Sequence, residues 1–161
     1  MIKTLIFFLL LPILSGVQHV ILDHLSIGSI HFELFLGYFI LIMILNKGDT
    51  KTRLPFALLA GLLDDVSTNA LLGTSVIAFL LLDRFIYIMN RILYNRKYHA
   101  YFTVLFSYIL YYFWKYLMRL LVVPTGLEIE SILLTLANSA LCSFVFYLLF
   151  LLAVKKGVKE E

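Results

Sequence analysis

The class of fold follows from one stretch of the chain, 100-AYFTVLFSYILYYFWKYLMRLLVV-123. Within it, Lys115 and Arg119 are the charged residues, and neither proline nor glycine interrupts it. A helix of roughly 20 apolar residues is long enough to cross the hydrocarbon core of a bilayer. The stretch therefore predicts a transmembrane helix with two ionisable side chains toward its end.

Further apolar runs lie on both sides of this stretch, and short polar segments separate them. They predict about six transmembrane helices in one polytopic membrane domain that covers residues 1–161. The third run is short and ends in two aspartates, so it could form a re-entrant hairpin with the fourth. The predicted helices are 2–22, 30–45, 54–67, 70–89, 100–123 and 129–154.

The composition agrees with this reading. Hydrophobic residues make up 62% of the chain and charged residues only 14%, whereas a soluble domain has roughly 25% charged residues. A globule of this size could not hide so much apolar surface from water. The single cysteine, Cys142, excludes a disulfide framework within the chain. We therefore expect an all-α integral membrane protein without a soluble domain.

The distribution of lysine and arginine predicts the orientation. In a six-span arrangement, eleven of the 13 cations fall at one side of the membrane. Cytoplasmic loops are enriched in these residues, so both termini are expected in the cytoplasm. The same loops are expected to contact anionic lipid headgroups. The eleven cations are Lys3, Lys47, Lys51, Arg53, Arg84, Arg91, Arg96, Lys97, Lys155, Lys156 and Lys159.

The two remaining cations predict an ion-pair cluster inside the outer leaflet. Lys115 and Arg119 are four residues apart and so lie on one helix face. Asp64 and Asp65 end the third run at a similar depth, and Glu33 opens the second run on that side. Because adjacent helical residues point about 100° apart, we expect only one aspartate to pair. The other is expected to cap the next helix or to face a polar crevice.

Three interpretations of these charges remain open. In the first, which we favour, the charges only pack the helix bundle, or Arg119 extends to the lipid headgroups. In the second, they form a proton relay or a substrate site. In the third, they shape a crevice for a protein partner. Ionisable groups at such depth are costly, so each interpretation requires partners for them.

Signatures of known enzyme classes are absent from the sequence. It contains no GxSxG, no HExxH, no pair of cysteines and no phosphate-binding loop, and the four histidines lack metal-ligand spacing on a common helix face. We therefore predict a protein that is not an enzyme and that binds no cofactor, metal or nucleic acid.

A second informative stretch is 61-GLLDDVSTNALLG-73. It combines a helix that ends in acidic residues, a polar turn that offers N-caps at Ser67 to Asn69, and a glycine that allows close helix contact. With Gly61, Asp65, Leu72 and Gly73 at the matching spacings, it resembles the motif of the rod shape-determining protein MreD family. Asp64 belongs to the same stretch. The chain departs from that pattern in the turn, where Leu71 replaces a proline.

The resemblance implies both a fold and a role. MreD-like proteins are similar in fold to the substrate-binding subunits (S components) of energy-coupling-factor transporters. The chain would then be a scaffold of the cell-elongation machinery (the elongasome) in the bacterial inner membrane. It would bind MreC and, through it, MreB, RodA and a class B penicillin-binding protein, and so help to maintain rod shape and direct peptidoglycan synthesis. Glu33, Lys115 and Arg119 would line a groove for a partner helix.

Two other functions are weighed against the scaffold. The first is a substrate-binding subunit of an energy-coupling-factor type vitamin transporter, which would need a deep pocket and a docking face for a coupling subunit. Few glycine and alanine positions are present for such a face. The second is a small lipid-processing membrane enzyme, which would depend on the ionisable residues Asp65 and Arg119.

Overall fold

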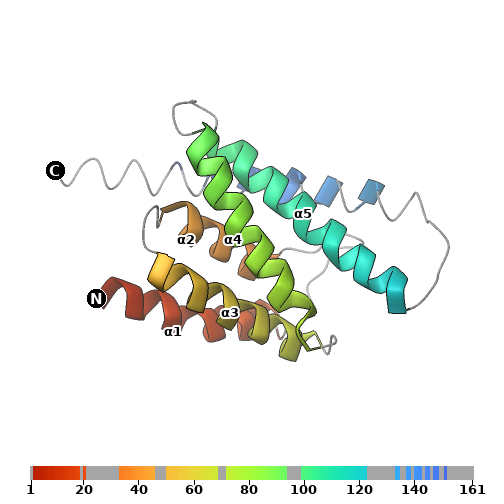
Figure 1. Cartoon of the computed structure of the whole chain (residues 1–161), viewed down its shortest axis with the longest axis horizontal. Coiled ribbons are helices and arrows are strands. Elements are labelled where there is room, and N and C mark those ends of the chain that lie inside the picture. Colours follow the sequence, from red (N-terminus) through yellow and green to blue (C-terminus); the bar gives the residue numbers. More distant parts are fainter. Residues whose placement is uncertain are drawn as a thin grey trace.

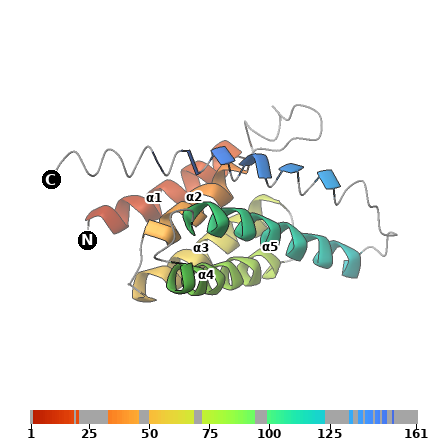
Figure 2. The same ribbon diagram turned by 90° about the horizontal axis from the view of Figure 1, so that it is seen from above.

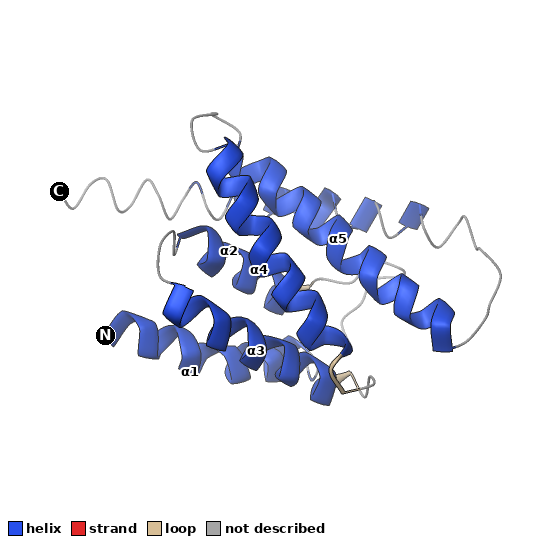
Figure 3. Cartoon of the chain, viewed as in Figure 1, coloured by secondary structure: helices blue, strands red, loops and turns tan. Residues whose placement is uncertain are grey.

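The structure is a computed structural model, and its described part is entirely helical apart from short turns (Figure 3). This confirms the predicted all-α class. Within the described part, no helix is both long enough and apolar enough to cross a membrane. The described residues are 2–18, 20, 33–45, 50–68, 72–93, 99–122, 133–134, 137–138, 140–142, 144–145, 147–148 and 151.

Five long helices form the bundle, with α3, α4 and α5 arranged as successive antiparallel neighbours (Figure 1). The described residues between 133 and 151 are helical too and lie along α5, where the rings of Tyr101 and Tyr147 are 5.4 Å apart. The rest of the predicted helix 129–154 lies outside the described residues. The five helices are α1 (Ile2–Val17), α2 (Leu34–Leu45), α3 (Thr50–Ser67), α4 (Thr74–Leu93) and α5 (His99–Val122).

The shortest helix, α2, is at the centre of the bundle. It contacts α1, α3, α4 and α5, and Figure 2 shows it between α1 and α5. Most of its side chains are buried, and none is charged. A helix that is hydrophobic on all sides is expected in such a position. The short second run of the sequence is therefore the core of the fold.

Aromatic rings join α2 to its neighbours. Phe39 of α2 makes an edge-to-face contact with Phe79 of α4, with 4.6 Å between ring centroids, and stacks on Phe56 of α3 at 5.9 Å. Phe79 also contacts Tyr111 of α5 at 5.7 Å. Such pairs add roughly 0.5–1.5 kcal/mol each beyond the area they bury. The rings thus determine how α3, α4 and α5 are rotated around α2.

Gly61 sets the distance between α3 and α4, the most extensively packed pair. A Cβ atom at this position would lie 2.4 Å from the Cα of Val76 and 2.7 Å from its backbone nitrogen. The two backbones therefore meet at a point that only glycine allows. This is the close helix contact that the sequence predicted for the motif.

Several helix boundaries differ from the predictions: α2 begins at Leu34 and not at residue 30, and α4 ends at Leu93 and not at residue 89. Two further differences have a physical reason. Helix α3 begins at Thr50 and not at residue 54, because the cation Arg53 is held inside the bundle. Helix α4 begins at Thr74 and not at residue 70, because Gly73 has a φ of 101°. That φ is incompatible with a right-handed helix.

An apolar face remains exposed on each of the helices α1, α3, α4 and α5. Val66 is 68% exposed and Leu121 is 77% exposed, values typical of residues that no other helix covers. Large exposed apolar areas mark surfaces that contact a membrane or another protein. Other exposed residues of these faces are Ile6, Leu9, Ile13, Leu54, Leu62, Ile77, Leu81, Ile88, Ile92, Phe102, Phe106, Phe113 and Leu117.

Candidate functional site

The candidate site lies where the end of α3, the start of α4 and the second half of α5 meet. Its first component is Asp65, which is 1% exposed. One carboxylate oxygen accepts the backbone N–H of Gly73 at 2.7 Å, and the other accepts the backbone N–H of Ser75 at 2.8 Å. The Thr74 hydroxyl donates to it at 3.2 Å. Asp65 therefore caps α4 from the preceding helix.

The sequence predicted both an aspartate and Ser67 to Asn69 as caps of this helix, and the aspartate forms the cap. Ser67 and Thr68 do not cap α4, because their hydroxyls donate to the carbonyl oxygens of Leu63 and Asp64 at 2.7 Å each. They thereby close the last turn of α3. Gly73, with its positive φ, lets the chain turn back so that the first amides of α4 point at Asp65. An aspartate at a helix N-terminus also interacts favourably with the helix dipole.

The second component is an ion pair between Asp64 and Lys115. The Lys115 ammonium donates to Asp64 at 2.7 Å and to the Ser75 hydroxyl at 2.8 Å. The Tyr111 hydroxyl donates to the same Asp64 oxygen at 3.0 Å, and the ammonium lies 5.4 Å from the centre of the Tyr111 ring. The two aspartates thus divide as the sequence led us to expect, because Asp64 pairs and Asp65 caps.

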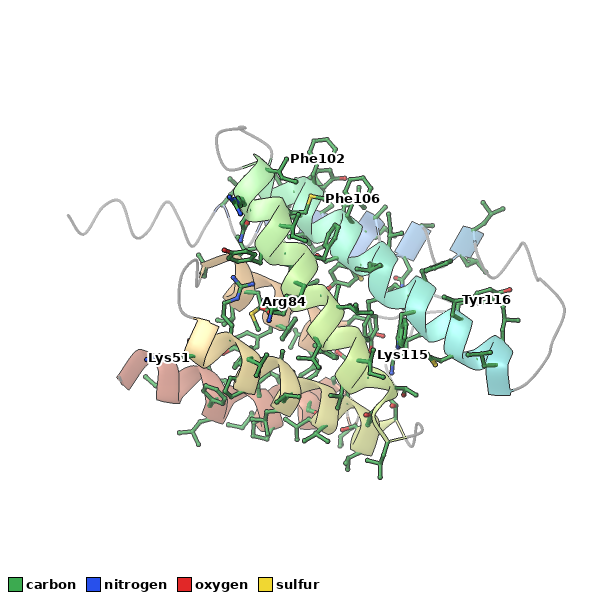
Figure 4. All side chains as sticks on the ribbon, viewed as in Figure 1. Lys51, Arg84, Phe102, Phe106, Lys115 and Tyr116 are labelled. Atoms are coloured by element: carbon green, nitrogen blue, oxygen red, sulfur yellow. The ribbon has the colours of Figure 1, made fainter. Side chains whose placement is uncertain are left out.

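The cluster is more enclosed on the aspartate side than on the lysine side. The Asp64 side chain is 5% exposed and that of Lys115 is 27% exposed. In Figure 4, Lys115 extends from α5 toward the end of the bundle where α3 and α4 meet. Nearby, the Trp114 indole N–H donates to the carbonyl oxygen of Thr74 at 2.9 Å. Polar contacts therefore connect α3, α4 and α5 at this end of the bundle.

Arg119 and Glu33 do not join this cluster. Arg119, one turn beyond Lys115, is exposed, and it takes part in none of the ion pairs formed by the described residues. Glu33 instead lies beside α5 about two turns before Lys115, where its carbonyl oxygen accepts the Tyr108 hydroxyl at 2.9 Å. Part of the predicted charge cluster is therefore spread along the length of α5.

A second buried ion pair lies near the other end of α3 and was missed by the sequence analysis. Arg53 donates from Nε to one carboxylate oxygen of Asp83 at 2.8 Å, and its Nη2 forms an ion pair with the same oxygen at 2.8 Å. Nη2 also donates to the Asp83 carbonyl oxygen at 3.1 Å. The two side chains are only 3% and 7% exposed, and the guanidinium lies 5.6 Å from the centre of the Tyr87 ring.

This pair corrects the assignment of Arg53 to a loop that contacts lipid headgroups. The signal that could have found it was Asp83, an acidic residue in the middle of an apolar run. A carboxylate in that position requires a cation or several donors, and Arg53 is the nearest cation across the α3–α4 hairpin. Ser75 and Tyr111 were missed as well, since neither residue type is unusual in an apolar helix.

The chemistry of the cluster formed by Asp64, Lys115 and Ser75 is limited by its enclosure. Ser75 and Lys115 have the spacing of a serine nucleophile and its base, but Ser75 is fully buried, so a substrate could not reach its hydroxyl. Lys115 is bound to Asp64 as an ammonium, which has no lone pair with which to accept the serine proton. Among the described residues, no group of three or more His, Cys, Asp or Glu side chains could hold a metal ion.

Comparisons with known proteins do not assign the chain to a family. No protein-family model, no curated protein and no solved structure matches it.

Proposed function

We propose that the chain is a non-enzymatic membrane scaffold of the MreD type, which binds MreC in the bacterial inner membrane and serves cell elongation. The observation that carries this proposal is the α3–α4 hairpin. Gly61 meets the backbone of α4, Asp65 caps α4, and Gly73 turns the chain between them. Each of these motif residues has a structural task in a rigid hairpin, which suits a scaffold better than a catalyst.

Two features support a membrane location. Apolar side chains are exposed on α1, α3, α4 and α5, where a soluble bundle would present charges. The charges inside the bundle are compensated, because Arg53 pairs with Asp83 and Lys115 with Asp64. Pairing lowers the cost of holding an ion away from water. With the termini in the cytoplasm, Lys115 would lie at the outer end and Arg53 at the inner end.

The outer end offers the surface on which a partner helix would pack. Leu72, in the turn between α3 and α4, is 77% exposed. Val66 precedes this turn, and both Arg119 and Leu121 lie on the last turns of α5, beyond the level of Ser75. An exposed apolar turn, with an exposed cation on the neighbouring end of α5, would match a partner helix that carries one acidic residue near its outer end. This is the type of surface on which a single-span protein would dock.

The test is co-purification of the detergent-solubilised chain with co-expressed MreC. We expect the wild-type chain to retain MreC and the variant Leu72→Lys to lose it while keeping its thermal stability. Leu45→Lys, an exposed position at the end of α2, is the matched control and is expected to retain MreC. Failure of the wild-type chain to retain MreC would overturn the proposal. Native mass spectrometry of the same sample would reveal a bound vitamin if the chain were instead a transporter subunit.

A further inference from the structure

One edge of α4 carries exposed cations that no acid on the same helix can neutralise. Asp83 is the sole acidic residue of α4. It is already paired with Arg53, which donates to its carboxylate and to its carbonyl oxygen. Arg84 and Arg91 are exposed, and neither takes part in the ion pairs of the described residues. A fixed positive charge is therefore displayed on the second half of this helix.

Spacing places these cations on one edge together with an aromatic ring. Arg84, Tyr87 and Arg91 are separated by three and four residues, so they follow one another along the helix. Ile88 and Ile92, which are 50% and 67% exposed, form the adjoining edge. A helix with a basic and aromatic edge beside an aliphatic edge is typical of the boundary between lipid tails and headgroups.

The exposed face of α4 changes character along its length. Before Arg84 its exposed residues are Ile77 and Leu81, and from Arg84 onward cations and an aromatic ring appear. The ring of Tyr87 lies against Arg53, which links the start of α3 to this edge.

We propose that Arg84, Tyr87 and Arg91 bind the phosphate groups of anionic phospholipids at the inner face of the membrane. The proposal rests on the proposed membrane location and assigns the lipid contact to specific residues. Arg53 is excluded from it, because Asp83 already uses its donors. The aliphatic edge of α4 enters the hydrocarbon, and the arginines extend to the headgroups.

The test is lipid retention by the purified full-length chain, measured by native mass spectrometry with phosphatidylglycerol and phosphatidylcholine at equal concentration. We expect the wild-type chain to prefer phosphatidylglycerol. Each of Arg84→Gln and Arg91→Gln should weaken that preference on the order of fivefold, the equivalent of about 1 kcal/mol per cation. Arg84→Lys should retain it, because the charge remains.

Arg119→Gln is the matched control, since Arg119 is an exposed arginine at the opposite end of the bundle. Equal retention of phosphatidylglycerol by the wild type and Arg84→Gln, or an equal loss in Arg119→Gln, would overturn the lipid site. Association with MreC is measured separately. A wild-type chain that binds MreC but does not prefer phosphatidylglycerol overturns the lipid site alone, and a wild-type chain that prefers phosphatidylglycerol but does not bind MreC overturns the scaffold alone.

Discussion

Arg53 and Asp83 are joined across the α3–α4 hairpin by an ion pair, in which two guanidinium nitrogens lie 2.8 Å from one carboxylate oxygen and Nε donates a hydrogen bond to it. Both side chains are almost fully buried. With the pair of Asp64 and Lys115 toward the other end of α3, the bundle contains one internal ion pair near each end of this helix. The partners of these pairs come from α3, α4 and α5. The polar contacts therefore help to determine the register of these helices relative to one another.

Arg53→Met should destabilise the fold strongly, because Asp83 would remain buried without its counter-ion. The expected loss in the free energy of unfolding is roughly 3–5 kcal/mol, read as a lower thermal unfolding temperature in detergent. Arg84→Met, next to Asp83 but exposed, should change it by less than about 0.5 kcal/mol. The double variant Arg53→Met with Asp83→Leu should recover most of the loss. Equal unfolding temperatures for the two single variants would contradict the buried pair.

Lys115→Met should also destabilise the protein, but less, since Lys115 is partly exposed. Asp64 would keep only the Tyr111 hydroxyl as a donor to its carboxylate oxygen. The expected loss is roughly 1–3 kcal/mol, measured by the same thermal unfolding assay. Arg119→Met serves as the control and should behave like the wild type. If the Arg119 variant were the less stable of the two, the assignment of the pair to Lys115 would be wrong.

Asp65→Ala should loosen the first turn of α4. The backbone N–H groups of Gly73 and Ser75 would lose their acceptors, at a cost of roughly 1–2 kcal/mol. Hydrogen exchange at these two amides should accelerate, while exchange in the middle of α4 should change less. Asp65→Asn keeps one acceptor oxygen and should show an intermediate rate. Unchanged exchange in the alanine variant would show that the cap does not hold the turn.

Gly61→Ala tests the close approach of α3 and α4. The added methyl group would meet the backbone of Val76 at 2.4 Å, so the helices must move apart and the unfolding temperature should fall. Gly16→Ala, in α1, meets nothing within 4 Å and should be neutral or stabilising by up to about 1 kcal/mol, because alanine favours a helix. A wild-type unfolding temperature for Gly61→Ala would show that the two backbones do not touch.

Asn90→Leu should stabilise the protein. Asn90 is 9% exposed, and both polar atoms of its amide lack a hydrogen-bond partner. Removing an unsatisfied buried amide should raise the free energy of unfolding by about 1 kcal/mol or more. Asn138→Leu provides the contrast, because its amide donates to the Tyr112 hydroxyl at 3.4 Å and its loss should destabilise. A lower stability of Asn90→Leu than of the wild type would indicate a partner for that amide.

The sequence determined the helical content, the approximate position of the five helices from α1 to α5 and the expectation that only one of Asp64 and Asp65 would pair. These features are local. Apolar runs determine where helices form, and the rotation of about 100° between adjacent residues prevents two neighbouring aspartates from facing one partner. The close contact at Gly61 was also predictable, since a glycine in an apolar helix beside a turn indicates close packing.

Only the tertiary structure decided which charges meet. Lys115 and Arg119 share a helix face, yet one is paired and the other exposed, because α5 continues past the level of Ser75 at the start of α4. Arg53 and Asp83 meet because α3 and α4 approach at Gly61 and are rotated by the rings around Phe39. The register and rotation of packed helices depend on contacts between residues far apart in the chain, which hydropathy along the sequence does not contain.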